Sequence, residues 1–209
     1  MEANYNQQPL FNSLESDSLD GPQVVVREPI AGLTDLPEFI SQGDETRLLQ
    51  TVTKQKWLQD LSRRVQHYGY KYDYKSRRID ASMKLGPMPH WISEVLAKLV
   101  ARGYFSKTPD QMIVNEYLPG QGIAPHVDCE PCFEDTIASL SLGSGTVMNF
   151  HQKSRKTEVY LPPRSIVVLK GESRYEWKHS IPKRKPDVIH GNRVKRTTRV
   201  SLTFRRVIL

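Results

Sequence analysis

Apolar and polar residues alternate with period two along the last strand-like segment of the chain, residues 198–207. Successive side chains of a strand point to opposite faces, so one face of this segment is polar and the other is apolar. The polar face holds Arg199, Ser201, Thr203 and Arg205, and the apolar face holds Val200, Leu202 and Phe204. A polar face turned into a protein requires a polar ligand or water beside it.

Short apolar runs separated by turn residues predict further strands from about residue 111 onward. We expect these strands over residues 112–117, 137–142, 147–150, 158–161 and 165–169. The turn pair Pro119-Gly120 follows the first of them. Strands at this spacing are typical of a β-sandwich or barrel.

Apolar residues at helical spacing predict two helices before these strands. Residues 89–101 carry the clearer apolar stripe, with Pro89 suited to the first turn and Gly103 to the stop. A more modest helix is predicted over residues 44–53. A β-branched run over residues 23–27 predicts the first strand. Together these elements indicate an α+β fold that is mainly β.

Four tyrosines between the two helices recur at every second position: Tyr68, Tyr70, Tyr72 and Tyr74. An extended strand would place all four rings on one face. Basic residues flank them, namely Arg63 and Arg64 before and Lys75, Arg77 and Arg78 after. Rings beside cations suit stacking on bases and pairing with phosphates. The alternative is that these rings simply cover a sheet face.

Composition is that of a globular protein, with 38% hydrophobic and 25% charged residues in a chain of 209. Residues 1–22 are polar and are expected to be a disordered tail, which leaves residues 23–209 as a single domain. The sequence contains no run of about 18 apolar residues and no apolar signal core. We therefore expect a monomeric, cytoplasmic protein.

Net charge favours a phosphate-bearing partner. The chain carries +7, and residues 1–22 contain four acidic residues but no Lys or Arg, so the remainder carries +11 (seven plus four). Such an excess attracts polyanions. The alternative is a surface whose charge serves only solubility.

The two cysteines, Cys129 and Cys132, stand in the order Cys-Glu-Pro-Cys. A lone pair at this spacing can be a redox pair or half of a zinc site, but no second cysteine pair follows. Two cysteines do not form a disulfide framework, so a reducing, intracellular setting is expected.

His126 and Asp128 are two residues apart, so on an extended segment both side chains project to one side. His179, 51 residues later, would complete a set of two histidines and one carboxylate, the arrangement of non-haem Fe(II) oxygenases. A lone His-x-Asp is common by chance. Arg199 strengthens the interpretation, because a guanidinium on an inward face is costly unless an anion such as a dicarboxylate pairs with it.

These residues belong to an ordered set of motifs. The set comprises Asn115-Glu116-Tyr117, His126-Val127-Asp128, Gly171-Glu172-Ser173-Arg174 ahead of His179, and Arg199 to Arg205. Over about residues 23–207 the chain resembles the AlkB family of 2-oxoglutarate- and Fe(II)-dependent dioxygenases. Stretches such as His67-Tyr68-Gly69-Tyr70 are most similar to the branch that contains the oxygenase domain of the tRNA wobble-uridine hydroxylase.

The resemblance implies a double-stranded β-helix (jelly roll) core with N-terminal helices and a nucleotide-recognition lid. It implies that His126, Asp128 and His179 bind Fe(II), which reacts with 2-oxoglutarate and O₂. It also implies a set of 2-oxoglutarate-binding residues: Asn115, Tyr117, Arg199, Ser201 and Arg205. Arg205 is assigned to the end of the co-substrate nearest the metal, and Ser201 replaces an Asn found in many family members.

The implied activity is hydroxylation or oxidative demethylation of a base in nucleic acid, either alkylated DNA or RNA or modified tRNA. The base would be flipped out or presented in a single strand. The lid corresponds to residues 63–78, and a basic stretch over residues 183–196 is expected to form a loop near the pocket mouth. The expected substrate contacts are Arg63, Arg64, Tyr68, Tyr70, Glu130, Trp177, Lys183 and Arg184.

Two alternatives to this activity have distinct signatures. The first is a non-catalytic, basic nucleic-acid-binding module on the same barrel, whose binding would be indifferent to iron and 2-oxoglutarate. The second is an oxygenase that acts on a protein side chain or a small molecule, whose turnover would be insensitive to charge reversal in the basic stretch.

Overall fold

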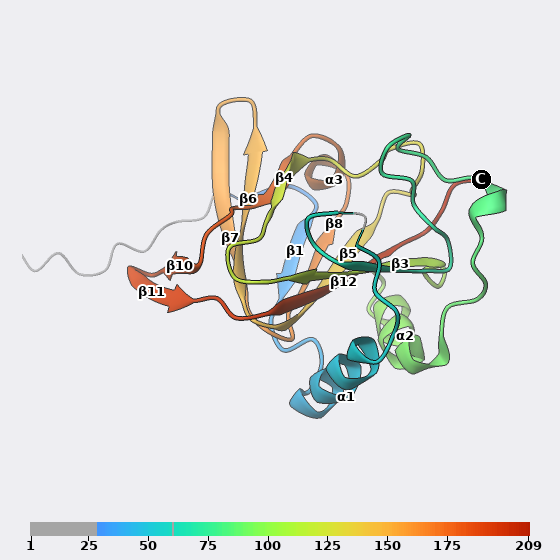
Figure 1. Cartoon of the computed structure of the whole chain (residues 1–209). Helices are drawn as coiled ribbons and strands as arrows, with labels where there is room; N and C mark the ends of the chain where they lie inside the picture. The colour runs from blue at the N-terminus through green and yellow to red at the C-terminus, as the bar shows by residue number, and fades with distance from the viewer. Residues whose placement is uncertain (1–28, 60) are drawn as a thin grey trace, which may run out of the picture.

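The computed structural model describes residues 29–59 and 61–209 (Figure 1). The predicted tail over residues 1–22 and the predicted strand over residues 23–27 lie outside the described residues. Two antiparallel sheets face each other, and helices cover the outer face of the larger one. This is the expected double-stranded β-helix, and the chain is mainly β as predicted.

The larger sheet has six strands in the order β1-β8-β5-β12-β3-β2, and every neighbouring pair is antiparallel. Its strands are β1 (Leu33–Leu36), β8 (Ile166–Leu169), β5 (Ile137–Gly143), β12 (Arg199–Arg205), β3 (Gln111–Tyr117) and β2 (Val65–Tyr68). The central strand, β12, pairs with β3 over its whole length, so Ser201 lies beside Asn115 and Arg199 beside Tyr117.

The smaller sheet has the order β4-β9-β6-β7. Its strands are β4 (Ile123–His126), β9 (Lys178–Ile181), β6 (Thr146–Gln152) and β7 (Arg155–Leu161). A separate hairpin is formed by β10 (Pro186–Ile189) and β11 (Asn192–Lys195), where the sequence predicted a loop. The hairpin lies at one end of the molecule, away from α1 and α2 (Figure 1).

Two longer helices, α1 (Gln42–Thr53) and α2 (Ser93–Ala101), pack on the larger sheet. The short 3-10 helix η2 (His90–Ile92) leads directly into α2, another 3-10 turn is η1 (Ala81–Met83), and α3 is Glu172–Tyr175. The two predicted helices are thus confirmed, with α1 beginning two residues early. No helix within the described ranges is both long and apolar enough to cross a membrane.

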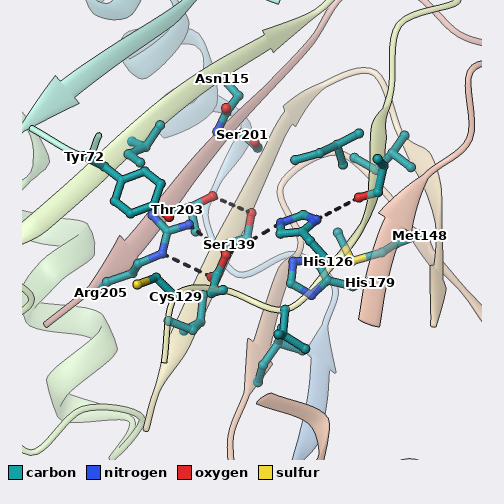
Figure 2. Close-up of a pocket in the computed structure, with 18 of the residues that line it drawn as sticks. Tyr72, Asn115, His126, Cys129, Ser139, Met148, His179, Ser201, Thr203 and Arg205 are labelled. Atoms are coloured by element: carbon teal, nitrogen blue, oxygen red, sulfur yellow. Dashed lines mark hydrogen bonds and ion pairs between the residues drawn. The ribbon is translucent and has the colours of Figure 1, made fainter. Parts of the chain in front are cut away.

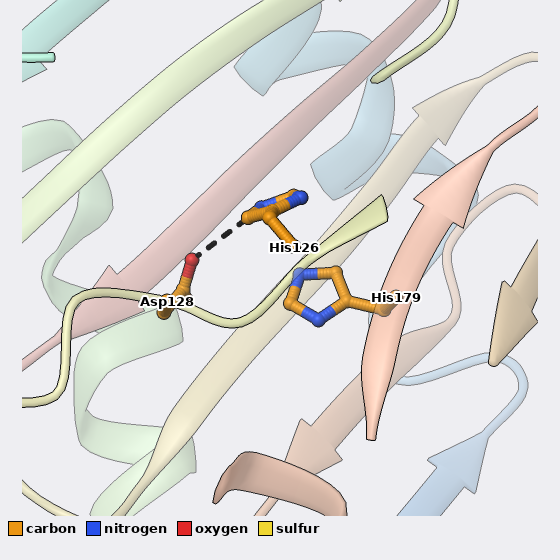
Figure 3. A group of neighbouring side chains, drawn as sticks. All are labelled: His126, Asp128 and His179. Carbon is orange, nitrogen blue, oxygen red and sulfur yellow. Dashed lines mark ion pairs between the residues drawn. The ribbon is translucent and has the colours of Figure 1, made fainter. Parts of the chain in front are cut away.

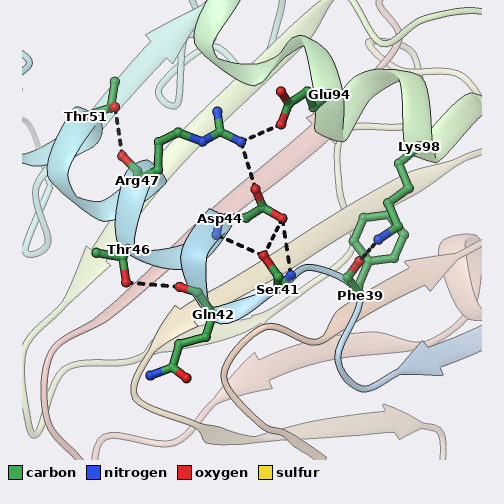
Figure 4. Close-up of polar contacts among 9 residues, drawn as sticks. All are labelled: Phe39, Ser41, Gln42, Asp44, Thr46, Arg47, Thr51, Glu94 and Lys98. Carbon is green, nitrogen blue, oxygen red and sulfur yellow. Dashed lines mark hydrogen bonds and ion pairs between the residues drawn. The ribbon is translucent and has the colours of Figure 1, made fainter.

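A capping box explains why α1 begins where it does. The Ser41 hydroxyl accepts a hydrogen bond from the Asp44 backbone N–H (3.1 Å), and the Asp44 carboxylate accepts one from the Ser41 backbone N–H (3.3 Å). Arg47 then joins the helices, because its guanidinium contacts both Asp44 (2.9 Å) and Glu94 of α2 (2.5 Å) (Figure 4). These contacts cap α1 and join it to α2.

The alternation in β12 separates a core from a cavity. The apolar side chains of Val200, Leu202 and Phe204 are buried with residues of α1 and α2. The side chains of Arg199, Ser201, Thr203 and Arg205 line a cavity between the two sheets. The predicted division of this strand into a polar and an apolar face is therefore confirmed.

The prediction of one strand carrying four tyrosines is wrong. Strand β2 ends at Tyr68, and Gly69 has a φ of +77°, a conformation that favours glycine. A Cβ at Gly69 would lie 1.8 Å from the Asp110 carbonyl oxygen. Because the chain turns there, Tyr68 packs edge-to-face on Trp91 in the outer core, whereas Tyr70 is buried between the sheets.

Cys129 and Cys132 are joined by a disulfide, which is compatible with the redox pair that the sequence left open. The bond lies in the turn that follows Asp128, and both residues are buried. The two sulfur atoms lie 3.1 and 3.4 Å from the backbone oxygen of Arg77. The pair therefore packs against the segment that the sequence assigned to the lid.

Candidate metal and co-substrate site

Three potential metal ligands meet at the open end of the smaller sheet. His126 ends β4 and lies directly opposite His179 of β9 in the strand register, and Asp128 follows two residues after His126. Their ligand atoms all lie within 4.8 Å of one another (Figure 3). His126 Nε2 is 3.7 Å from Asp128 Oδ1. The structure thus brings together the three ligands that the sequence predicted.

Hydrogen bonding leaves the histidines suited to a metal. His126 Nδ1 lies 2.8 Å from the Ala124 carbonyl oxygen, so Nδ1 carries the proton and Nε2 keeps a free lone pair. His179 Nδ1 is buried and has no hydrogen-bond partner among the described residues. A donor set of two imidazoles and one carboxylate on one side of an ion fits Fe(II) and leaves positions open.

Charge at this end of the cavity also fits a cation. Burial alone would raise the pKa of the Asp128 carboxyl, but the Arg205 guanidinium, followed by the two imidazoles, holds that pKa well below its usual range. Burial, followed by the neighbouring His126, lowers the pKa of His179 to about 4. At neutral pH the site therefore offers an anionic carboxylate and a neutral His179, the protonation states that metal binding requires.

Arg205 contacts the metal-ligand set directly. Its Nε and Nη2 donate to the two carboxylate oxygens of Asp128 at 3.2 and 3.4 Å, and its Nη1 donates to Gln111 Oε1 at 3.2 Å. The sequence assigned Arg205 to the metal-proximal end of 2-oxoglutarate. In the structure Arg205 lines the cavity, and its two hydrogen bonds to Asp128 fix the orientation of that carboxylate.

Arg199 occupies the other end of the polar face of β12, beside Tyr117 and Asn115. It is only 3% exposed, and its Nη2 donates to Ser141 Oγ at 2.9 Å. Its Nε has no hydrogen-bond partner, and the described residues supply no ion pair to it. Burial lowers the pKa of Arg199 to about 10, so the group is still charged at neutral pH. A buried cation without an anion requires a ligand that carries one.

The cavity that joins these two ends has a volume of about 380 Å³. Figure 2 shows Asn115 and Ser201 at one end, and Arg205 with the histidines at the other. Apolar side chains such as Ile123, Met148 and Leu169 form the rest of its inner wall. All of the predicted co-substrate residues line the cavity: Asn115, Tyr117, Arg199, Ser201 and Arg205.

Most of the expected substrate contacts lie elsewhere. Arg63 lines the cavity, but Arg64 pairs with Glu116, and Tyr68 and Tyr70 belong to the two cores. Tyr68 and Tyr70 lie outside the cavity wall because the chain turns at Gly69. The structure therefore moves these two rings away from the position that a continuous strand would give them.

The other expected contacts are also outside the cavity wall. Trp177 is fully buried, and its Nε1 donates to Glu172 Oε1 at 2.9 Å, so protein atoms cover its ring. Glu130 is exposed and is not among the cavity-lining residues. Lys183 is exposed, whereas Arg184 donates to the buried Asp187 at 2.7 Å.

The site-residue prediction did not include the aromatic and cationic side chains that close the cavity. These are Tyr72, Tyr74, Arg77 and Phe133. Tyr72 and Tyr74 pack edge-to-face with ring centroids 5.0 Å apart, and Tyr72 also contacts Phe133 (5.8 Å). The tyrosine pattern was a signal for the first two, but only Tyr72 and Tyr74 of its four members line the cavity.

Comparison with known families agrees with this geometry. The family model described as "2OG-Fe(II) oxygenase superfamily" matches residues 29–205, which contain all three metal ligands and both arginines of β12. The chain belongs to this superfamily. Its relatives place it in the AlkB family, so it is a dioxygenase that uses Fe(II), 2-oxoglutarate and O₂.

Three relatives illustrate the similarity. Protein L905 of Acanthamoeba polyphaga mimivirus is 36% identical over 85% of each chain. The "Alkylated DNA repair protein ALKBH8 homolog" of Arabidopsis thaliana is 37% identical over 85% of this chain and 59% of its own length. The "Probable RNA/DNA demethylase ALKBH6" of Danio rerio is 30% identical, with coverage of 90% and 91%. The chain thus spans 59% of the Arabidopsis protein.

A solved structure shows the same fold at lower identity. The structure of OsALKBH1 superposes with a TM-score of 0.65 and 18% identity, covering 84% of this chain and 96% of that one. This likeness confirms the architecture of the two facing sheets.

Proposed function

We propose that this dioxygenase oxidises a base in nucleic acid, by stable hydroxylation or by oxidative demethylation. The observation that carries the proposal is the pair of tyrosines, Tyr72 and Tyr74, at the side of the cavity that the lid segment closes. The names of the Arabidopsis and zebrafish relatives, which refer to alkylated DNA repair and to RNA/DNA demethylation, support the same substrate class.

A flat, partly polar ligand suits this aromatic wall. Tyr72 and Tyr74 are partly buried, and the Tyr74 hydroxyl is buried without a hydrogen-bond partner among the described residues. Burial raises the pKa of both phenols, so they remain donors at neutral pH. A nucleobase offers a π face for the rings and ring or exocyclic acceptors for a hydroxyl. Arg77 adds a cation at the exposed edge of the wall.

Separate groups of residues hold the metal, bind the co-substrate and line the space for the substrate. Bound Fe(II), together with 2-oxoglutarate and O₂, supplies the hydroxylation of a C–H bond. His126, Asp128 and His179 would hold the metal, and Arg205 orients Asp128. Arg199 would pair with the distal carboxylate of the co-substrate. The apolar inner wall excludes water from the space where the substrate carbon must lie.

The β10–β11 hairpin supplies a second, electrostatic element. Arg184 and Arg196 both pair with the buried Asp187. Four further cations are exposed and have no ion pair within the described ranges: Lys183, Lys185, Arg193 and Lys195. Strand register places Val188, Arg193 and Lys195 on one face of the hairpin. Free cations on an exposed hairpin suit phosphate groups of a nucleic-acid strand.

The proposal is tested by mass spectrometry of nucleosides after incubation with Fe(II), 2-oxoglutarate and ascorbate. Substrates are unfractionated tRNA and single-stranded DNA or RNA carrying methylated bases. We expect either a nucleoside heavier by one oxygen or a nucleoside that has lost a methyl group with release of formaldehyde. Asp128→Ala should give neither. Unchanged nucleosides from every nucleic acid, with 2-oxoglutarate consumption stimulated instead by a protein or small molecule, would contradict the proposal.

The hairpin is tested by charge reversal. A variant with Lys185→Glu, Arg193→Glu and Lys195→Glu should bind single-stranded RNA more weakly and with a shallower salt dependence. Its 2-oxoglutarate turnover without nucleic acid should be unchanged. The matched control is Lys54→Glu, an exposed cation after α1. Equal RNA affinity of the triple variant and the control would exclude the hairpin as a phosphate contact.

A further inference from the structure

Arg63 lies just before β2 and beside the central part of β3. Its side chain is 9% exposed and lines the cavity. Its Nε donates to the buried Asn115 Oδ1 at 2.8 Å. The remaining nitrogens, Nη1 and Nη2, have no hydrogen-bond or ion-pair partner among the described residues. The guanidinium therefore has donors available inside the cavity.

Arg63 and Arg199 flank the same residue. The guanidinium carbon of Arg63 lies 5.6 Å from the centroid of the Tyr117 ring, and that of Arg199 lies 5.5 Å from it. Both arginines are buried, and neither has a carboxylate partner within the described part of the chain. Two unpaired cations in one cavity wall raise the free energy of the ligand-free state, because no anion lies beside them.

The neighbouring Arg64 shows the opposite arrangement. Its Nε and Nη2 donate to the two carboxylate oxygens of Glu116 at 2.5 and 2.8 Å, and its guanidinium stacks on Trp57. Arg64 is not among the cavity-lining residues. Consecutive arginines thus point to opposite sides of the extended chain, and of the two only Arg63 has no counter-ion among the residues that the structure describes.

We propose that Arg63 is a second 2-oxoglutarate-binding arginine, which acts beside Arg199 through the Nη donors that face the cavity. Asn115 holds its Nε, so the guanidinium is oriented before the co-substrate arrives. The segment that contains Arg63 also contributes Leu61, Tyr72 and Tyr74 to the cavity wall. Bound 2-oxoglutarate would therefore also hold the start of this segment against β3. Arg63 was expected from the sequence to contact nucleic acid, and its burial assigns it to the co-substrate instead.

The test is calorimetric titration of 2-oxoglutarate into protein loaded with Mn(II), which occupies the metal site without turnover. We expect Arg63→Ala to weaken binding by at least about tenfold, the effect of losing a charged hydrogen bond. Arg63→Lys should lose less, because it keeps the charge without the planar fork. The matched control, Arg64→Ala, should bind 2-oxoglutarate as the wild type does.

One further readout and one further variant complete the test. Mn(II) affinity, measured by electron paramagnetic resonance, should be equal in all variants, which excludes loss of the metal site as the cause. If Arg63→Ala does not fold, Arg63→Met keeps the buried volume and replaces it. Wild-type 2-oxoglutarate affinity in Arg63→Ala, or equal losses in Arg63→Ala and Arg64→Ala, would overturn the proposal.

The role of Arg63 can be tested independently of the substrate class. The calorimetry uses no nucleic acid, so it can succeed even if the substrate is of another class. Single-stranded RNA binding without metal or 2-oxoglutarate should be the same in wild type and Arg63→Ala. Loss of RNA binding with unchanged 2-oxoglutarate affinity would show that Arg63 contacts nucleic acid and would overturn the assignment.

Discussion

The two ends of the cavity carry the same residue type on the same strand but in opposite electrostatic states. At the metal end, Arg205 has its counter-ion in the protein, because its guanidinium contacts both oxygens of Asp128. At the co-substrate end, Arg199 is also buried, but within residues 29–59 and 61–209 its only side-chain hydrogen-bond partner is the Ser141 hydroxyl. One end is therefore neutralised by the fold and the other is left for a ligand.

This difference explains how a small cavity can hold the metal at one end and the co-substrate at the other. Asp128 remains anionic and correctly oriented when no metal is bound, because Arg205 stabilises it. The co-substrate end instead carries an uncompensated positive charge, which any bound dicarboxylate would neutralise. Specificity for a dicarboxylate thus follows from the lack of a protein carboxylate beside Arg199 in the described part of the chain.

The largest expected effect comes from removing the shared carboxylate at the metal end. Asp128→Ala should reduce 2-oxoglutarate turnover by more than about a thousandfold, since loss of a mere supporting partner of a metal ligand already costs about 10–100-fold. Succinate release with Fe(II) and O₂ measures this. The control is His90→Ala, an exposed histidine outside the cavity. Comparable succinate release in Asp128→Ala and the control would refute the metal assignment.

The free energy of unfolding should distinguish Arg205 from Arg199. Arg205→Met leaves Asp128 buried without its cation and should lower the free energy of unfolding of the ligand-free protein by about 3–5 kcal/mol. Arg199→Met removes a buried cation that has no anion, so it should change that free energy little or raise it. Urea denaturation measures both. Equal destabilisation by the two substitutions would contradict the difference drawn between the two ends.

Acid should destabilise the metal end in a defined range of pH. The folded-state pKa of His179 is about 4, below its unfolded value of about 6.5, so the unfolded chain takes up the proton first. The resulting loss of stability begins as pH falls below about 6.5 and is complete near 4, with an upper limit of about 3 kcal/mol. The lowered pKa of Asp128 adds a further loss below about pH 4.

His179→Gln isolates the histidine contribution. Urea denaturation of the metal-free protein at pH 7 and pH 4.5 should show a smaller loss of stability in this variant than in the wild type. The loss that comes from Asp128 occurs below about pH 4 and therefore lies outside this comparison. An identical pH dependence in wild type and variant would show that His179 is not held neutral by its surroundings.

Periodicity and spacing were sufficient for part of the site, whereas Asn115 and Tyr117 were implied only by the resemblance to the AlkB family. A period of two in β12 assigned Arg199 to the cavity, and Val200 to the opposite core, as the structure confirms. The spacing of His126 and Asp128 placed both side chains on one side of the chain. These inferences need only the geometry of an extended segment.

The sequence was not sufficient where long-range contacts decide the outcome. The close approach of Gly69 to Asp110 breaks the tyrosine pattern, and these two residues are 41 positions apart (110 minus 69). The partner of Arg205 is Asp128, and the partner of Arg64 is Glu116, neither of which is local. Which arginine retains a free charge depends on these pairings, so charge alone could not distinguish Arg63 from Arg64.

The most direct test of the contrast between the two ends is the protein's preference for a second carboxylate. Calorimetry on Mn(II)-loaded protein would compare 2-oxoglutarate with 2-oxobutyrate, which keeps the 2-oxo acid group but lacks the distal carboxylate. We expect the wild type to bind 2-oxoglutarate at least about 30-fold more tightly than 2-oxobutyrate, a ratio that corresponds to the binding free energy of one buried charged pair. Arg199→Met should lose most of this preference. An Arg199→Met variant that discriminates as well as the wild type would contradict the account.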